Sequence, residues 1–157
     1  MYLKNVCLKN FLKYKKLSVE FKAGLNVLIG ENDSGKTAII DAIRYVLNTK
    51  SYEQVRFDEK DFHQQKGKNI RESAFEIEVI FNGFEDKESG NFLEWAYFNE
   101  EKEYEVRIIL TANLQANNRI LYDIKAGPTN AESQMDGNAR DLLKVKYLKP
   151  LRDDENE

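Results

Sequence analysis

Alternating apolar and polar positions predict strands in the first part of the chain. Residues 2–11 mix apolar and basic side chains as a half-buried strand does, and residues 17–21 alternate strictly between the two kinds. After a turn at Ala23 and Gly24, residues 25–29 read LNVLI, a short apolar run that is typical of a strand buried on both faces. We therefore expect three strands within the first 30 residues.

From Lys36 onward the apolar positions follow a helical period. A helix is predicted from Lys36 to about residue 47, followed by a polar and irregular excursion over residues 48–73 that we expect at the surface. The apolar positions that define this helix are Ile39, Ile40, Ile43, Val46 and Leu47.

The second half of the chain predicts an antiparallel meander. Alternation marks strands at residues 75–81, 104–110 and 120–124, and the Asn117-Asn118 pair predicts the turn between the last two. Short helices are expected at residues 86–98 and 138–143, followed by the apolar segment Val145, Tyr147, Leu148 and Leu151.

The segment between the LNVLI run and the predicted helix contains a phosphate-binding pattern. It reads GENDSGKT and matches the phosphate-loop pattern G-x-x-x-x-G-K-[ST] at every fixed position, with the strand before it and the helix after it that the motif requires. Backbone N–H groups of such a loop point inward beside the positive end of a helix dipole, and glycine lets the backbone approach phosphate oxygens closely. The sequence therefore predicts a site for a nucleoside triphosphate with Mg²⁺, of the type that binds ATP.

Within this loop, Lys36 is expected to reach the β- and γ-phosphates and the Thr37 hydroxyl to bind Mg²⁺, which makes Thr37 the one metal ligand predicted. The residues predicted to bind the cofactor are Gly30, Glu31, Asn32, Asp33, Ser34, Gly35, Lys36 and Thr37.

Residues for hydrolysis are not identifiable beside this loop. A carboxylate that holds the metal should lie at the end of another apolar strand. Asp123 is the residue that comes nearest to this pattern, but it is followed by Ile124 rather than by an acidic residue. We expect Asp123 to be strand surface, and the lone His63 to make local hydrogen bonds rather than bind a metal. The fragment should bind nucleotide without efficient turnover.

Composition and charge exclude some classes of protein. The net charge of −3 does not by itself indicate a protein that binds nucleic acid. The first 22 residues, however, contain six lysines and only one acidic residue, Glu20, and could contact DNA. Cys7 is the single cysteine, in an apolar stretch, so we expect core packing and a reducing, cytoplasmic location. No apolar run approaches the length of a membrane span. The six lysines of the first 22 residues are Lys4, Lys9, Lys13, Lys15, Lys16 and Lys22.

Residues 9–47 resemble the start of ABC-type ATPases of the RecF and SMC class, in which an N-F-x-x-Y/F segment, a strand ending in E-F and G-L-N-V-L-I-G-x-N-x-S-G-K-T occur in this order. Residues 56–63, RFDEKDFH, and residues 147–153, YLKPLRD, look like the OLD (overcoming lysogenization defect) family. The likeness implies an ABC-type ATPase joined to a Toprim nuclease, a homodimer formed through the ATPase, action on DNA and a role in anti-phage defence.

The resemblance implies an α/β P-loop NTPase fold of ABC-ATPase type. Residues 1–157 would be its first lobe, with the meander packed beside the phosphate-loop strand and helix. The family's signature, acidic strand-end and nuclease motifs have no counterpart in these residues, and Gln115 and Gln134 are candidates by position for its Mg²⁺-sensing glutamine. The function expected is the ATP/Mg-binding lobe of an OLD-like DNA endonuclease. A RecF/SMC-type DNA repair or chromosome-organising ATPase without nuclease activity is the alternative, and a standalone interaction module is a third.

Overall fold

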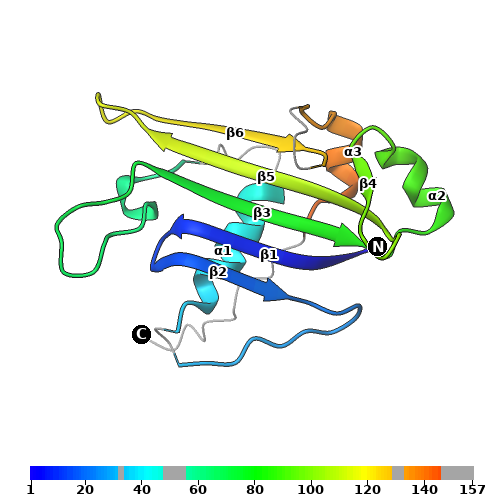
Figure 1. Cartoon of the computed structure of the whole chain (residues 1–157), viewed down its shortest axis with the longest axis horizontal. Helices are drawn as coiled ribbons and strands as arrows, with labels where there is room; N and C mark the ends of the chain where they lie inside the picture. The colour runs from blue at the N-terminus through cyan, green and yellow to red at the C-terminus, as the bar shows by residue number, and fades with distance from the viewer. Residues whose placement is uncertain (32–33, 48–55, 129–132, 146–157) are drawn as a thin grey trace, which may run out of the picture.

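A single antiparallel sheet of six strands forms the body of the protein (Figure 1). The computed structural model describes residues 1–31, 34–47, 56–128 and 133–145. The strands lie in the order β2-β1-β3-β5-β4, and β6 pairs with β5 beside β4. Their bounds are β1 Tyr2–Phe11, β2 Tyr14–Glu20, β3 Ala74–Asn82, β4 Ala96–Phe98, β5 Tyr104–Leu114 and β6 Ile120–Ala126. The strands predicted at residues 2–11, 17–21, 75–81, 104–110 and 120–124 are confirmed as β1, β2, β3, β5 and β6.

The N-terminal hairpin and the meander belong to one sheet because β1 lies between β2 and β3. Val6 of β1 pairs with Val19 of β2 on one side and with Val79 of β3 on the other. Both pairings are antiparallel, so alternate residues of all three strands share a face. The sequence predicted the strands but not this long-range pairing.

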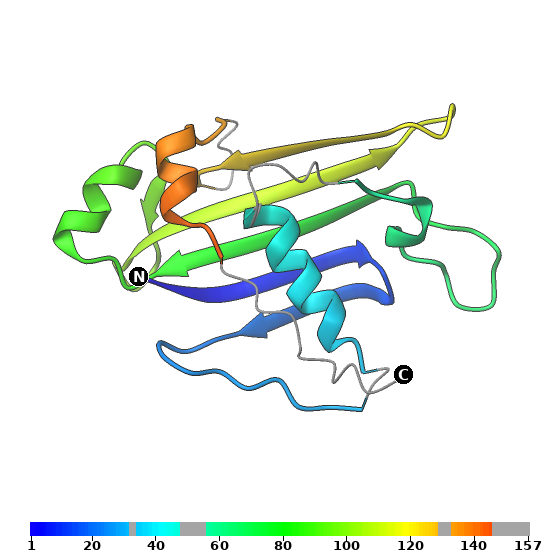
Figure 2. The same cartoon turned by 180° about the vertical axis from the view of Figure 1, so that it is seen from behind.

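Helices cover one face of the sheet (Figure 2). Helix α1, Lys36–Leu47, contacts β1, β3 and β5, and the short helix α3, Gly137–Leu142, lies beside it on the same face. The α1 residues buried against the sheet are Ala38, Ile39, Ala42, Val46 and Leu47. The predicted helix is therefore confirmed, and Ala38 and Ala42 belong to its buried face, whereas Ile40 and Ile43 of the predicted stripe are half-buried.

Aromatic side chains form the core at the hairpin end of the sheet. Phe75 of β3 lies 5.1 Å from Phe11, 5.2 Å from Phe57 and 4.9 Å from Phe62 between ring centroids, in tilted or edge-on orientations. Phe11, Phe62 and Phe75 are buried. Edge-on packing suits aromatic quadrupoles, so this cluster anchors the loop after α1 to the sheet.

The other face of the sheet carries polar side chains and is not covered by the described helices. Glu78 of β3 and Arg107 of β5 form an ion pair of 3.5 Å on this face. Cys7 lies here as well, since its Sγ is 2.9 Å from Asn5 Oδ1 and 3.4 Å from Ser18 Oγ. The expectation that Cys7 packs in the core is wrong, because the pleat sends Val6 and Leu8 inward and Cys7 outward.

The segment predicted as one helix over residues 86–98 is divided. It forms the helix α2, Asp86–Ser89, the 3₁₀ turn η2, Gly90–Phe92, and then β4. Pairing of Tyr97 with Glu105 and of Phe98 with Tyr104 draws its end into the sheet. Tertiary pairing thus overrode the local helical pattern.

The LNVLI run is not a strand, which corrects the prediction of a strand buried on both faces. Leu25, Val27 and Ile29 are 92%, 69% and 91% exposed, and residues 25–30 carry no regular secondary structure. The segment runs outside β2, along the edge of the molecule. An apolar strand needs neighbours on both sides, and none of the described strands pairs with it.

The remaining described elements are short. The 3₁₀ turn η1, Glu59–Asp61, is closed by two hydrogen bonds. The Asp58 carboxylate accepts from the Lys60 N–H at 2.9 Å, and the Asp61 carboxylate accepts from the Asp58 N–H at 2.8 Å. The helix predicted at residues 138–143 is confirmed as α3, and the apolar segment from Tyr147 onward lies outside the described residues. Among the described helices, none has both the length and the apolar character needed to cross a membrane.

Candidate nucleotide-binding site

The phosphate-loop segment leads directly into the first turn of α1. Ser34 N donates to Glu31 O at 2.9 Å, which closes a turn, and the helix begins at Lys36. Gly30, Glu31 and residues 34–37 are described, whereas Asn32 and Asp33 lie outside the described residues. The loop therefore ends where the unpaired N–H groups of a twelve-residue helix point outward.

Gly35 has a geometry that only glycine adopts without strain. Its φ is +90°, in the left-handed region. A Cβ there would also collide with the Tyr14 hydroxyl and come within 2.7 Å of Lys13 Cε. Gly30 is similarly restricted, because a Cβ would lie 2.5 Å from Ser34 Oγ. Both fixed glycines of the motif thus have a steric reason to be glycine.

Lys36 and Thr37 lie in the first turn of α1, beside the loop. The Lys36 ammonium donates to the carbonyl oxygens of Gly30 and, at 3.1 Å, of Glu31, so it lies over the loop. Thr37 is exposed in the first turn of α1, and that turn contains no acidic residue. A cation, a free hydroxyl and the positive helix end suit a phosphate chain with Mg²⁺.

Tyr14 is a contact of the loop that sequence reasoning missed. Its hydroxyl donates to the Ser34 carbonyl oxygen at 2.9 Å, which joins the β1–β2 hairpin tip to the phosphate loop. The signal available was the aromatic residue of the N-F-x-x-Y segment, Asn10 to Tyr14, but only the fold shows that this tip reaches the loop.

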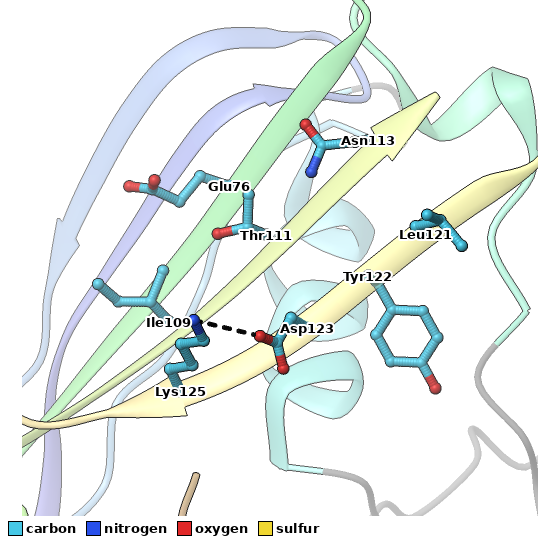
Figure 3. Close-up of a pocket in the computed structure, with 8 residues that line it drawn as sticks. All are labelled: Glu76, Ile109, Thr111, Asn113, Leu121, Tyr122, Asp123 and Lys125. Atoms are coloured by element: carbon cyan, nitrogen blue, oxygen red, sulfur yellow. Dashed lines mark ion pairs between the residues drawn. The ribbon is translucent and has the colours of Figure 1, made fainter. Parts of the chain in front are cut away.

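Asp123 lies on the open face of the sheet, opposite the face that α1 covers (Figure 3). Asp123 Oδ2 is 3.5 Å from Lys125 Nζ, and its Oδ1 accepts from Gln134 Nε2 at 3.3 Å. Asp123 pairs across the strands with Thr111, beside a hollow of about 440 Å³. These residues thus point away from the face that carries α1, and Asp123 makes surface contacts as expected.

Gln115 belongs to the turn between β5 and β6. Its N–H donates to the Arg119 carbonyl oxygen at 2.8 Å, and the Asn118 N–H donates to its carbonyl oxygen at 2.9 Å. The backbone of Gln115 is thereby fixed in a hairpin at the far end of β5, which confirms the predicted turn at residues 117–118. Neither glutamine is brought to the phosphate loop.

His63 makes the local hydrogen bond that the sequence suggested. Its Nδ1 is 2.9 Å from Leu12 O, and its N–H donates to Asn10 O at 2.9 Å. Across the described ranges, no group of three or more His, Cys, Asp or Glu residues is arranged to hold a metal ion.

Comparison with known proteins points to one class. The model of the AAA domain family AAA_23 matches residues 5–154. The DNA replication and repair protein RecF of Bacillus thuringiensis (strain Al Hakam) is 40% identical over 86 residues, which cover 50% of this chain and 23% of RecF. RecF of Bacillus cereus (strain B4264) matches to the same extent. The chain therefore spans only about a quarter of the length of these relatives.

Solved structures agree on the fold. An SMC ATPase described for ATP-driven dimerization and DNA-stimulated activation superposes with a TM-score of 0.54 at 20% identity, over 91% of this chain and 75% of that one. The recombination mediator RecF with ATP gives 0.51 at 19% identity, over 87% and 29%. These likenesses show an α/β P-loop fold of the ABC-type, RecF/SMC-like ATPase head. Since the family model spans nearly all of the chain, the protein belongs to the AAA_23 family of AAA domains.

Proposed function

We propose that this chain binds ATP with Mg²⁺ through residues 30–37. The observation that carries the proposal is the position of Lys36 and Thr37 at the start of α1, behind a glycine whose backbone only glycine tolerates. Lys36 neutralises the β- and γ-phosphates, Thr37 binds the metal, and the backbone N–H groups of the first turn receive phosphate oxygens.

Calorimetric titration with ATP and Mg²⁺ tests this proposal. Lys36→Ala should weaken binding at least about tenfold, because a charge-assisted contact is worth roughly 1.5–3 kcal/mol. Lys102→Ala is a matched control, since Lys102 is an exposed lysine in the turn before β5. If the wild-type protein binds ATP no better than Lys36→Ala, the proposal is wrong.

We further propose that residues 1–157 are the first lobe of a larger ATPase domain. The exposed side chains of Leu25, Val27 and Ile29 support this, because each loses roughly 1.5–3 kcal/mol of burial energy by remaining in water. A strand added by a further segment would cover them and complete the phosphate-loop strand. Hydrogen exchange tests the idea: the amides of residues 25–29 should be protected in the protein extended beyond Glu157 and exchange rapidly in residues 1–157. Equal rates in both would reject it.

For the whole protein we propose a RecF/SMC-type ATPase that acts on DNA and dimerises through its ATPase domains. The order of motifs in residues 9–47 and the likeness to RecF and SMC heads support this reading. A partner subunit would complete the site, so residues 1–157 alone should hydrolyse ATP negligibly. Robust turnover at low protein concentration would show that the acidic catalytic residues are already present.

An OLD-like endonuclease is the second candidate. Residues 56–63 favour it by their likeness to that family, while the other supporting segment, residues 147–153, lies outside the described residues. Such a nuclease would need a Toprim-like acidic cluster in the continuation of the reading frame, whereas a long coiled coil there would favour the SMC reading. Mg²⁺-dependent nicking of supercoiled plasmid by the extended protein would support the nuclease, and intact plasmid would reject it.

A further inference from the structure

Negative charge is concentrated at the end of the sheet that lies away from the phosphate loop. Helix α2, turn η2, strand β4 and the turn into β5 gather there, beside the N-terminus (Figure 1). Residues 84–104 contain seven acidic residues and two lysines, a net charge of −5, although the whole chain carries only −3. We call residues 84–104 the acidic end. Its acidic residues are Glu85, Asp86, Glu88, Glu94, Glu100, Glu101 and Glu103.

Most carboxylates of the acidic end have no cation beside them. Glu88 pairs with the N-terminal ammonium at 3.2 Å, and Glu103 pairs with Lys4 at 3.5 Å. Within the described part of the chain, no cation lies within ion-pair distance of the other five. Like charges that are gathered without counter-charges repel one another, so the acidic end favours a positively charged occupant.

Large apolar side chains are exposed among these charges. Phe98 of β4 is 70% exposed, and Leu93, which directly follows η2, is 69% exposed. Met1, just before β1 at the same end of the sheet, is exposed as well. The acidic end therefore combines negative charge with apolar area that a partner can bury.

A row of aromatic rings holds Phe98 in place. The Phe98 ring lies 5.9 Å from the Tyr104 ring between centroids, and the Tyr104 ring lies 5.4 Å from Phe84. Phe84 in turn lies 5.3 Å from Phe92, which is fully buried. The Tyr104 hydroxyl donates to Ser89 O at 2.8 Å and so joins β5 to α2. Because the row is fixed at its buried end, less side-chain freedom is lost when a partner covers Phe98.

Charge and apolar area together decide the class of the occupant. Phosphodiester backbones and anionic membrane surfaces carry the same sign as the acidic end and are repelled by it. A bound cation alone would leave Phe98 and Leu93 in water, and among the described residues no group of three or more His, Cys, Asp or Glu is arranged to hold a metal ion. An amphipathic helix with lysine or arginine around an apolar stripe satisfies both features, since the stripe buries apolar side chains and the cations meet carboxylates or aromatic rings.

We propose that the acidic end is a docking surface for a basic amphipathic helix of a partner protein. Phe98 and Leu93 are its anchors, and the surrounding carboxylates orient the helix and speed its association. Tyr14, which contacts the phosphate loop, lies at the opposite end of the β1–β2 hairpin, so docking does not depend on nucleotide binding.

Fluorescence anisotropy with a labelled synthetic helix of about 18 residues tests the class of partner. The probe has leucine at positions i, i+3, i+4 and i+7 and lysine elsewhere, and should bind with a Kd below about 100 μM. The same residues in scrambled order present no apolar face and should bind at least about fivefold more weakly. Equal binding of the scrambled peptide, or no binding of the helical one, would overturn the proposal.

Two double variants test the anchors. Leu93→Ser/Phe98→Ser should weaken binding of the helical peptide at least about tenfold, because both apolar contacts are lost. Ile70→Ser/Leu121→Ser is the control: both side chains are exposed, one before the start of β3 and one beside the far end of β5. This control should bind within about twofold of wild type, and equal losses in the two double variants would overturn the site.

Two further double variants test the charges. Glu94→Gln/Glu101→Gln should weaken binding at least about threefold at low salt and reduce its salt dependence. Glu20→Gln/Glu59→Gln removes the same charge from exposed residues outside the acidic end and should leave both unchanged. Salt-independent binding that is equal in these two variants would overturn the proposal, since a basic partner requires the carboxylates.

Other occupants of the acidic end give different results. If sedimentation shows self-association that Leu93→Ser/Phe98→Ser abolishes, a second copy of the chain is the occupant and the proposal fails. It also fails if residues 1–157 bind the peptide but the protein extended beyond Glu157 does not, because the continuation of the chain then covers the surface. Circular dichroism spectra and an ATP affinity within about twofold of wild type should show that each variant is folded, so loss of docking is told apart from loss of nucleotide binding.

Discussion

Replacing the carboxylate of Glu105 should destabilise the protein, because this side chain is the centre of a buried polar network. Glu105 is 5% exposed. Its Oε1 accepts from Lys4 Nζ at 2.7 Å, Asn99 Nδ2 at 2.9 Å and Asn82 Nδ2 at 3.3 Å, and its Oε2 accepts from the Tyr97 hydroxyl at 3.0 Å. These partners belong to β1, β3, β4 and the turn before β5, so one carboxylate joins four segments.

The size of the effect follows from what each substitution leaves behind. Glu105→Gln keeps the shape of the side chain but removes the negative charge that accepts hydrogen bonds from Lys4 and Tyr97. It should lower the free energy of unfolding by about 2 kcal/mol. Glu105→Ala leaves the ammonium, the phenol and two amides without their acceptor, and should cost about 3–5 kcal/mol. Glu101→Gln, an exposed glutamate in the adjacent turn, should change the free energy by less than about 0.5 kcal/mol.

The pH dependence of the free energy of unfolding is a second test of the Glu105 hydrogen bonds. Burial pushes the pKa of Glu105 upward, but hydrogen bonds from Lys4, Asn99 and Tyr97 outweigh it and hold the pKa below its ordinary value. The unfolded chain therefore binds a proton first as pH falls. The stabilisation by Glu105 is fully present above its unfolded pKa, about 4.3, and is lost as pH falls through the lower folded value.

At alkaline pH the sign is reversed. Burial, followed by the hydrogen bond to the Glu105 carboxylate, raises the pKa of Tyr97 to about 12. The folded protein then retains a proton that the unfolded chain releases near pH 10, so stability should fall between about pH 10 and 12.

Urea unfolding followed by the fluorescence of Trp95 measures these effects. Trp95 is the single tryptophan, it is buried, and it lies beside β4, so it reports on the region of the network. The difference between wild type and Glu105→Gln should be largest near pH 7 and shrink below about pH 4. A Glu105→Gln variant as stable as Glu101→Gln at pH 7, or a difference independent of pH, would refute the account.

Two other substitutions test the loop and the core. Gly35→Ala should weaken ATP binding at least about tenfold, since a Cβ at a φ of +90° meets Tyr14 and Lys13; unchanged binding in calorimetry would contradict the steric account, and Gly67→Ala, at another left-handed glycine with open space around it, is the control. Phe75→Ala should lower the free energy of unfolding by about 3–5 kcal/mol because three rings pack on Phe75. Phe98→Ala removes an exposed ring and should cost far less in the same denaturation assay, whereas similar destabilisation by both would show that the cluster contributes little.

Local patterns were enough to predict most of the helices and strands. The alternation in β3 and β5 and the helical period of α1 arise because these segments each place one side against the core. The glycine at position 35 follows from short-range geometry, as its φ of +90° shows. These features depend on residues that are close in the sequence.

Tertiary structure decided the features that depend on distant partners. Pairing with β5 converted the end of the predicted helix at residues 86–98 into β4, and the pleat of β1 placed Cys7 on the open face. The LNVLI run reads as a buried strand, yet its side chains are exposed because strand formation requires neighbours that the sequence pattern does not reveal. The contact of Tyr14 with the loop likewise arises only because segments about 20 residues apart come together.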